Sequence, residues 1–209
     1  MQAARGAPLT PSGTNRPPSN RTRPARARAR LLTLFAAVAA LGYATDVVTK
    51  TLAVARLTGR PPVHAVGDLL MFDLTRNPGA AFSTGTSYTL VLSVVAIVAA
   101  CAVLWVARRL GSTGWAVALG FLLAGVLGNL TDRVFRAPGF LHGHVVDFLQ
   151  LPHWPVFNVA DMCINVAAAL IVIQALRGVS VSGSRARKAG GAPEPARAAE
   201  PDDDPEAAL

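Results

Sequence analysis

The chain has 209 residues, of which 52% are hydrophobic and only 15% are charged, a composition that is unusually apolar for a soluble protein of this length. Its formal net charge of +8 could indicate nucleic-acid binding, but the N-terminal arginines directly precede an apolar run. Such a pattern is typical of the cytoplasmic flank of a membrane helix. We therefore expect a membrane protein without a nucleic-acid partner.

Four apolar segments have roughly the length that is needed to span a bilayer. Residues 1–30 precede them as a basic extension, and residues 178–209 follow as a tail that ends in acidic residues; both lack apolar periodicity and are expected to be disordered. The predicted transmembrane domain covers residues 31–177, and its apolar segments are residues 31–48, 88–107, 114–130 and 156–176.

The first apolar segment could instead be a cleaved signal peptide, because arginines, an apolar run and small residues follow one another. It is longer than the apolar region of most signal peptides, which is about 7–15 residues, and this favours a retained helix. With the N-terminus inside, fourteen of the twenty Lys and Arg residues lie on the cytoplasmic side. We therefore expect both termini to be cytoplasmic.

The first outer connection contains Leu70, Phe72 and Leu74 in alternation with other residues, which predicts a short half-buried strand. The expected fold class is an all-α membrane protein with four transmembrane helices. A small β or loop element would lie at the interface on the extracytoplasmic side.

Polar residues at membrane depth are costly and usually functional, and here they form four blocks at outer helix ends or in outer loops. The first block places Asp46 and Lys50 four residues apart on one helix face, either as a local ion pair or as a substrate contact. The second begins with Asn77, Pro78 and Gly79, and Pro-Gly suits the centre of a type II turn.

The third block contains Asn129 and Arg133 one helical turn apart, so both side chains can face the bundle interior. Asp132 lies near the same helix C-terminus, where the helix dipole disfavours a negative charge. We expect Asp132 to pair with an arginine and to have a structural role.

The fourth block contains two acids in different surroundings. Asp147 lies in an apolar run, which predicts a raised pKa, because burial disfavours the charged carboxylate. Asp161 follows Asn158 by three residues, like the acid of a capping box, and the helix dipole there favours an ionised carboxylate. Two carboxyls whose environments push them toward different protonation states suit acid–base hydrolysis.

Other chemistries find little support in the sequence. There is no HExxH zinc motif, the four histidines have no paired metal-ligand spacing, and Cys101 and Cys163 form no CxxC motif. A serine nucleophile would need a nearby base, and Ser112 lies on the inner side, far from any candidate. We therefore expect neither a metal nor another cofactor.

In this order, the blocks closely resemble the lipoprotein signal peptidases (signal peptidase II). That family carries D-x-x-x-K, N-P-G-A-A-F, G-N-x-x-D-R, V-x-D-F and F-N-x-A-D, and all five patterns occur here within about residues 40–170. The resemblance implies a catalytic dyad of Asp147 and Asp161 near the outer membrane boundary. It also implies supporting or substrate-binding roles for Asp46, Lys50, Asn77, Gly79, Asn129, Asp132, Arg133 and Asn158.

The resemblance further implies a bacterial cell-membrane enzyme that cuts diacylglyceryl-modified prolipoproteins just before the lipidated lipobox cysteine. It also implies inhibition by globomycin. For partners other than the substrate, we expect membrane lipids only, and we expect the protein to be monomeric. The mechanism we expect is direct attack by water, with Asp161 ionised at the start and Asp147 protonated.

Two rival functions predict other arrangements of the acids. A proton-coupled transporter or channel subunit would spread them through the membrane depth, whereas here they lie toward one side. A non-catalytic scaffold would leave unexplained the cost of Asp147 in its apolar run.

Overall fold

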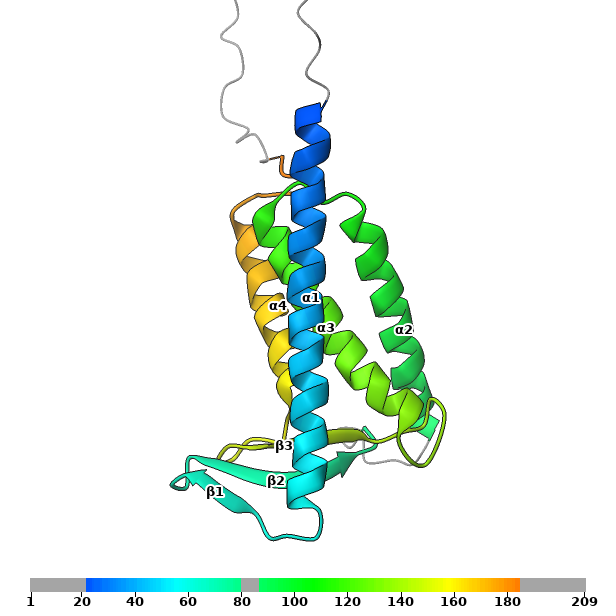
Figure 1. Cartoon of the computed structure of the whole chain (residues 1–209), viewed down its shortest axis with the longest axis vertical. Helices are drawn as coiled ribbons and strands as arrows, with labels where there is room; N and C mark the ends of the chain where they lie inside the picture. Colours follow the sequence, from blue (N-terminus) through cyan, green and yellow to red (C-terminus); the bar gives the residue numbers. More distant parts are fainter. Residues whose placement is uncertain (1–21, 80–86, 185–209) are drawn as a thin grey trace, which may run out of the picture.

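The computed structural model describes residues 22–79 and 87–184. The helices in this part are α1 (Thr22–Leu57), α2 (Ser87–Ala107), α3 (Thr113–Phe135) and α4 (Val159–Leu176), and the strands are β1 (Val63–Val66), β2 (Leu70–Asn77) and β3 (Val145–Gln150). The helices form a bundle, the sheet lies across one of its ends, and the described chain begins and ends at the other (Figure 1).

All four helices are long and apolar enough to cross a membrane. The shortest, α4, has 18 residues, which at about 1.5 Å per residue is close to the thickness of the hydrocarbon core. The protein is therefore a multi-pass membrane protein, and the expected fold class is confirmed.

Helix α3 is the centre of the bundle, since it contacts each of the other three helices. Small residues allow this close approach: a Cβ atom on Gly125 would lie 2.4 Å from the Ala160 carbonyl oxygen of α4. On another face, a Cβ on Gly120 would lie 2.9 Å from the Val38 side chain of α1. Both neighbours are rigid parts of helices, so larger residues would force the helices apart.

The apolar core lies toward the bundle end that is opposite the sheet. It joins α1, α2 and α3 through buried side chains, namely Phe35, Ala39, Ala100, Val103, Ala107, Leu110, Ala116, Leu119, Leu123 and Val126.

The sheet has the order β1-β2-β3, and both pairings are antiparallel. The predicted half-buried strand is confirmed as β2, and in its pairing with β3 Thr75 lies opposite Asp147. The sequence analysis did not identify β1 or β3. Strand β3 is buried from Val145 to Phe148, so it lacks the alternation that marks a strand with one exposed face.

Several expected boundaries were wrong. Helix α1 begins at Thr22, so residues 22–30, which we expected to be disordered, are helical; Arg and Ala both favour the helix.

Residues 178–184, expected to belong to a disordered tail, instead fold against the turn between α2 and α3. The Gly111 N–H donates to the Val181 carbonyl at 2.9 Å and the Trp115 indole N–H donates to the Val179 carbonyl at 2.8 Å. The remaining parts of the two extensions, residues 1–21 and 185–209, lie outside the described residues.

Candidate active site

Lys50 lies at the centre of a buried polar network at the sheet end of the bundle. Its side chain is 1% exposed, and its ammonium group lies 2.8 Å from Asp46 Oδ2 and 2.9 Å from Asp132 Oδ2. It also donates to Asn129 Oδ1 at 2.9 Å. Two carboxylates and one amide oxygen therefore surround the ammonium group of Lys50. An ion pair within α1, one of the two roles considered for this block, is therefore present, and the network extends to Asp132 of α3.

Asp46 connects this network to the start of α4. Its Oδ1 accepts a hydrogen bond from the Ala160 backbone N–H at 2.8 Å, and Asp46 itself is fully buried. The residue after Ala160 is Asp161, so Asp46 holds the backbone that carries this acid.

Asp132 makes the corresponding connection to β3. Its Oδ2 accepts from the Val146 backbone N–H at 3.1 Å, and Val146 directly precedes Asp147. Its Oδ1 accepts from the Nε of Arg136, which confirms the expected pairing with an arginine. Asp46 and Asp132 thus act alike: each binds the backbone N–H of the residue before one member of the expected dyad.

Asp147 is 2% exposed and lies between two asparagine amides. Asn77 donates to its Oδ2 at 2.9 Å, and Asn158 donates to its Oδ1 at 2.6 Å. Burial raises the pKa of Asp147 to about 6, and the nearby charge of Asp161 adds to this rise, while the two amide hydrogen bonds oppose it. The rise that was expected from the apolar run is confirmed.

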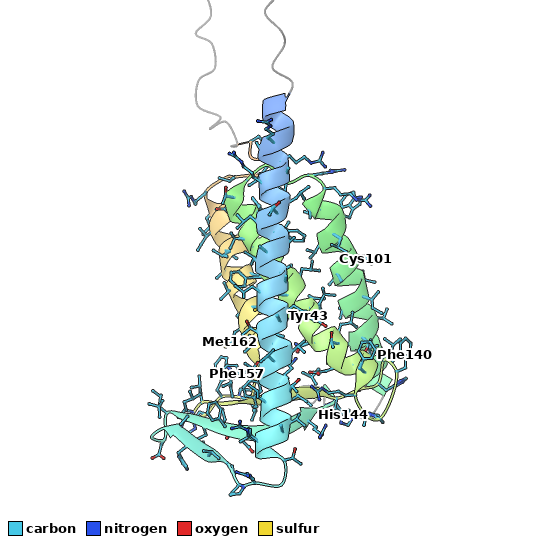
Figure 2. The ribbon with its side chains drawn as sticks, viewed as in Figure 1. Tyr43, Cys101, Phe140, His144, Phe157 and Met162 are labelled. Atoms are coloured by element: carbon cyan, nitrogen blue, oxygen red, sulfur yellow. The ribbon has the colours of Figure 1, made fainter. Side chains whose placement is uncertain are left out.

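Asp161 lies in the first turn of α4 and forms a complete capping box with Asn158. Its Oδ2 accepts from the Asn158 backbone N–H at 3.1 Å, and its Oδ1 accepts from the Asn129 amide at 2.9 Å. Unlike Asp147, it is only partly buried and lines an open pocket of about 440 Å³. Phe157 and Met162 also line this pocket, and both lie where α4 meets the sheet (Figure 2).

Two asparagines join the acids into one network. The fully buried Asn158 amide donates to Asp147 and, at 3.2 Å, to Asn129 Oδ1. Because Asn129 Oδ1 accepts from both Lys50 and Asn158, the Asn129 amide nitrogen is left to donate to Asp161. The orientation of each amide is therefore determined by its neighbours.

The other expected site residues border this network. Asn77 Oδ1 accepts from the Gly79 N–H at 2.8 Å, and Gly79 has a φ of +112°, as a glycine in the predicted turn would. The rest of that motif, residues 80–82, lies outside the described residues. Arg133 is 9% exposed and its charge acts on Asp132, Asp147 and Asp161. Among the described residues, its Nη1 has no hydrogen-bond partner.

A family model described as signal peptidase (SPase) II matches residues 38–177. The chain belongs to the signal peptidase II family. It is 48% identical over 161 residues to a lipoprotein signal peptidase of Mycobacterium avium, which covers 77% of this chain and 88% of the relative. A lipoprotein signal peptidase of Leifsonia xyli is 41% identical over 193 residues, covering 91% of this chain and 89% of the relative.

Two solved structures have a similar fold. A structure described as a bacterial membrane enzyme, obtained by the in meso method at 1.9 Å resolution, has a TM-score of 0.60 and 27% sequence identity. The match covers 67% of this chain and 90% of that one. A second structure with the same description, at 2.3 Å resolution, has a TM-score of 0.58 and 26% identity.

Within this signal peptidase II, two polar residues near the network were not identified from the sequence. Arg136 is the ion-pair partner of Asp132, one helical turn further along the chain. Asn165 lines the same pocket as Asp161 and follows it by one helical turn. An amide within an otherwise apolar span was the available signal for Asn165. In residues 22–79 and 87–184, no group of three His, Cys, Asp or Glu side chains could hold a metal ion.

Proposed function

We propose that this signal peptidase II cuts diacylglyceryl-modified prolipoproteins just before the lipidated cysteine, and that Asp147 and Asp161 are its catalytic pair. The protein is an aspartic peptidase that removes signal peptides from prolipoproteins, as its family does. The observation that supports the choice of these two acids is that they belong to one hydrogen-bond network but differ in burial. Asp147 is buried between two amides, whereas Asp161 lines an open pocket.

In the proposed mechanism, Asp161 begins ionised and accepts a proton from the attacking water. Its carboxylate lies at the start of α4 and accepts hydrogen bonds from the Asn158 backbone N–H and the Asn129 amide, which hold it beside the pocket. Lys50 supports the arrangement from a distance, because its bond to Asn129 Oδ1 turns the amide nitrogen toward Asp161.

Asp147 begins protonated, polarises the scissile carbonyl and then gives its proton to the leaving amine. Its pKa of about 6 keeps the protonated form roughly a hundredfold more populated near neutral pH than an ordinary aspartate with a pKa of 3.8 would allow. A buried carboxyl that is protonated more readily than an ordinary aspartate, beside one that is open to the pocket, suits the division of roles that this hydrolysis needs.

The supporting residues divide into two groups. Asp46 and Asp132 each hold the backbone N–H of the residue before one of the two acids, and Lys50 binds both of them. The second group, Asn77, Asn129 and Asn158, orients the carboxylates of the pair. Gly79 shapes the turn that carries Asn77. Arg133 would donate its Nη1 hydrogens to a carbonyl of the bound peptide, since no described residue uses them.

We further propose that the enzyme lies in the bacterial cell membrane with its site near the extracytoplasmic face and both termini in the cytoplasm. The arginines of the N-terminal region, together with Arg108, Arg109 and Arg177, support this orientation. The sheet and the proposed dyad lie at the end of the bundle that is opposite the described chain ends (Figure 1).

The decisive experiment is incubation of the purified protein with a diacylglyceryl-modified precursor peptide, followed by mass spectrometry of the products. The expected result is a single cut immediately before the lipidated cysteine, and much slower cleavage of the same peptide without its lipid. An intact lipidated peptide, or a cut at another bond, would contradict the proposal. Proton transport by reconstituted protein that does not cleave would instead favour the transporter.

A further inference from the structure

Asn165 presents an amide group on the outer surface of a membrane helix. It lies in the second turn of α4, within the membrane span Val159–Leu176, and its side chain is exposed. Its Nδ2 donates one hydrogen bond, to the Asp161 carbonyl at 3.0 Å. No described residue bonds its second N–H or its Oδ1. Polar groups in contact with lipid are costly, so this amide needs a partner from outside the described part of the chain.

The pocket around Asn165 shows where such a partner would lie. Asp161 and Asn165 are one turn apart on α4, about 6 Å along the helix axis, and both line the pocket of about 440 Å³. Met162 and Val166 continue the lining along the same helix, and both are roughly half exposed. The pocket therefore connects Asp161, one acid of the proposed pair, to apolar side chains on the exposed surface of α4.

We propose that Asn165 is a specificity-determining residue that donates a hydrogen bond to an ester carbonyl of the substrate's diacylglyceryl group. This inference rests on the proposed function, which places the lipidated cysteine directly after the scissile bond and therefore close to Asp161. The acyl chains then run along Met162 and Val166 into the bilayer.

An ester carbonyl suits Asn165 better than a peptide carbonyl does. In a membrane, the carbonyls of a helical signal peptide are bonded by N–H groups of the same helix. A diacylglyceryl group has no N–H of its own, so its ester carbonyls need a donor from the protein. Asn165 supplies this donor one turn deeper in the membrane than Asp161.

The test pairs a variant with a change in the substrate. The variant is Asn165→Leu, which removes the amide but keeps an apolar side chain of similar size. The first substrate is a diacylglyceryl-modified precursor peptide, and the second carries the same two chains through ether bonds, without carbonyl groups. Cleavage is measured in lipid, and kcat and KM are determined separately.

With the ester substrate, Asn165→Leu is expected to raise KM about three- to tenfold, the value of one hydrogen bond, and to leave kcat within about twofold. With the ether substrate, the wild type should already have the higher KM, and Asn165→Leu should add nothing. Asn165→Ser, which retains a hydroxyl donor, should recover part of the ester preference.

The control variant is Val172→Leu, which lies deeper on α4, is 55% exposed and does not line the pocket. It should match the wild type with both substrates, and thermal melts should show that all variants are folded. An equal rise in KM for both substrates would overturn the assignment to the ester, and an unchanged KM would overturn any role of Asn165 in binding. A wild type that fails to cleave the ester substrate would contradict the proposed function itself.

Discussion

At the sheet end of the bundle, Asp46, Lys50 and Asp132 form a buried ionic network, whereas the opposite end is packed with apolar side chains such as Phe35 and Leu119. Apolar packing stabilises a fold without requiring one orientation of each group. Buried ion pairs gain little net stability but require definite partners. The difference suggests that the polar end positions backbone for chemistry, while the apolar end keeps the helices together.

The same comparison applies to the two proposed catalytic acids. Asp147 lies on a strand and is buried, while Asp161 lies on a helix and faces a pocket. Each is preceded by a residue whose N–H is held by an acid of the ionic network, namely Ala160 by Asp46 and Val146 by Asp132. Because Lys50 binds both of these acids, one side chain links the positions of the two elements.

The largest effect is expected from the pair itself. Asp147→Asn and Asp161→Asn remove a proton-exchanging group but keep size and polarity. Each should lower turnover of a lipidated precursor by about a thousandfold or more, and the double variant should be little worse, because residues that act as a unit are not additive. Both variants should remain folded by thermal melt. Near wild-type cleavage by either one would show that the wrong acid has been assigned.

Asp132→Asn should separate positioning from catalysis. The amide oxygen can still accept from Val146, but the charge that balances Lys50 and Arg136 is lost. Removing one partner of a buried ion pair costs about 3–5 kcal/mol, so the melting temperature should fall at least as clearly as turnover per folded molecule. An inactive variant with unchanged stability would instead indicate that Asp132 takes part in the reaction.

The pH dependence of stability should report the burial of Asp147. Its pKa is raised from 3.8 to about 6, so the folded protein binds this proton more tightly than the unfolded chain does. The tighter proton binding therefore stabilises the folded protein fully below about pH 4. This stabilisation, on the order of 2–3 kcal/mol in the free energy of unfolding, is lost as the pH rises through about 6. Melts across this range should show the wild type losing stability relative to Asp147→Asn. A constant difference between the two proteins would contradict the raised pKa.

The helices and most residues of the candidate site could be predicted from the sequence, because a long apolar segment and polar residues at membrane depth are both local signals. The i,i+4 pair of Asp46 and Lys50 and the capping box of Asn158 and Asp161 are also local. The bond from Ala160 to Asp46 spans 114 residues, and no pattern within either segment indicates it. Strand β3 was missed for a similar reason, since burial on both faces depends on what packs around it.

The smallest expected effect lies at the apolar end and concerns the segment from Gly178 to Ser184. Two backbone carbonyls in it accept from Gly111 and Trp115, and Val181 packs against the apolar core. A chain that ends after Arg177 should therefore lose about 1–3 kcal/mol of stability, from two hydrogen bonds and one partly buried valine. Its turnover per folded molecule should stay within about twofold, because the dyad is at the other end of the bundle.

The matched control for this truncation is a chain that ends after Ser184, which keeps all of these contacts and removes only residues 185–209. We expect this control to have the melting temperature and the turnover of the full chain, since the composition of residues 185–209 does not favour a packed core. The two truncations thus differ by seven residues that the structure places against the α2–α3 turn. If the shorter chain lost turnover about tenfold while keeping its melting temperature, the apolar end would influence the reaction, and the separation between a positioning end and a packing end would not hold.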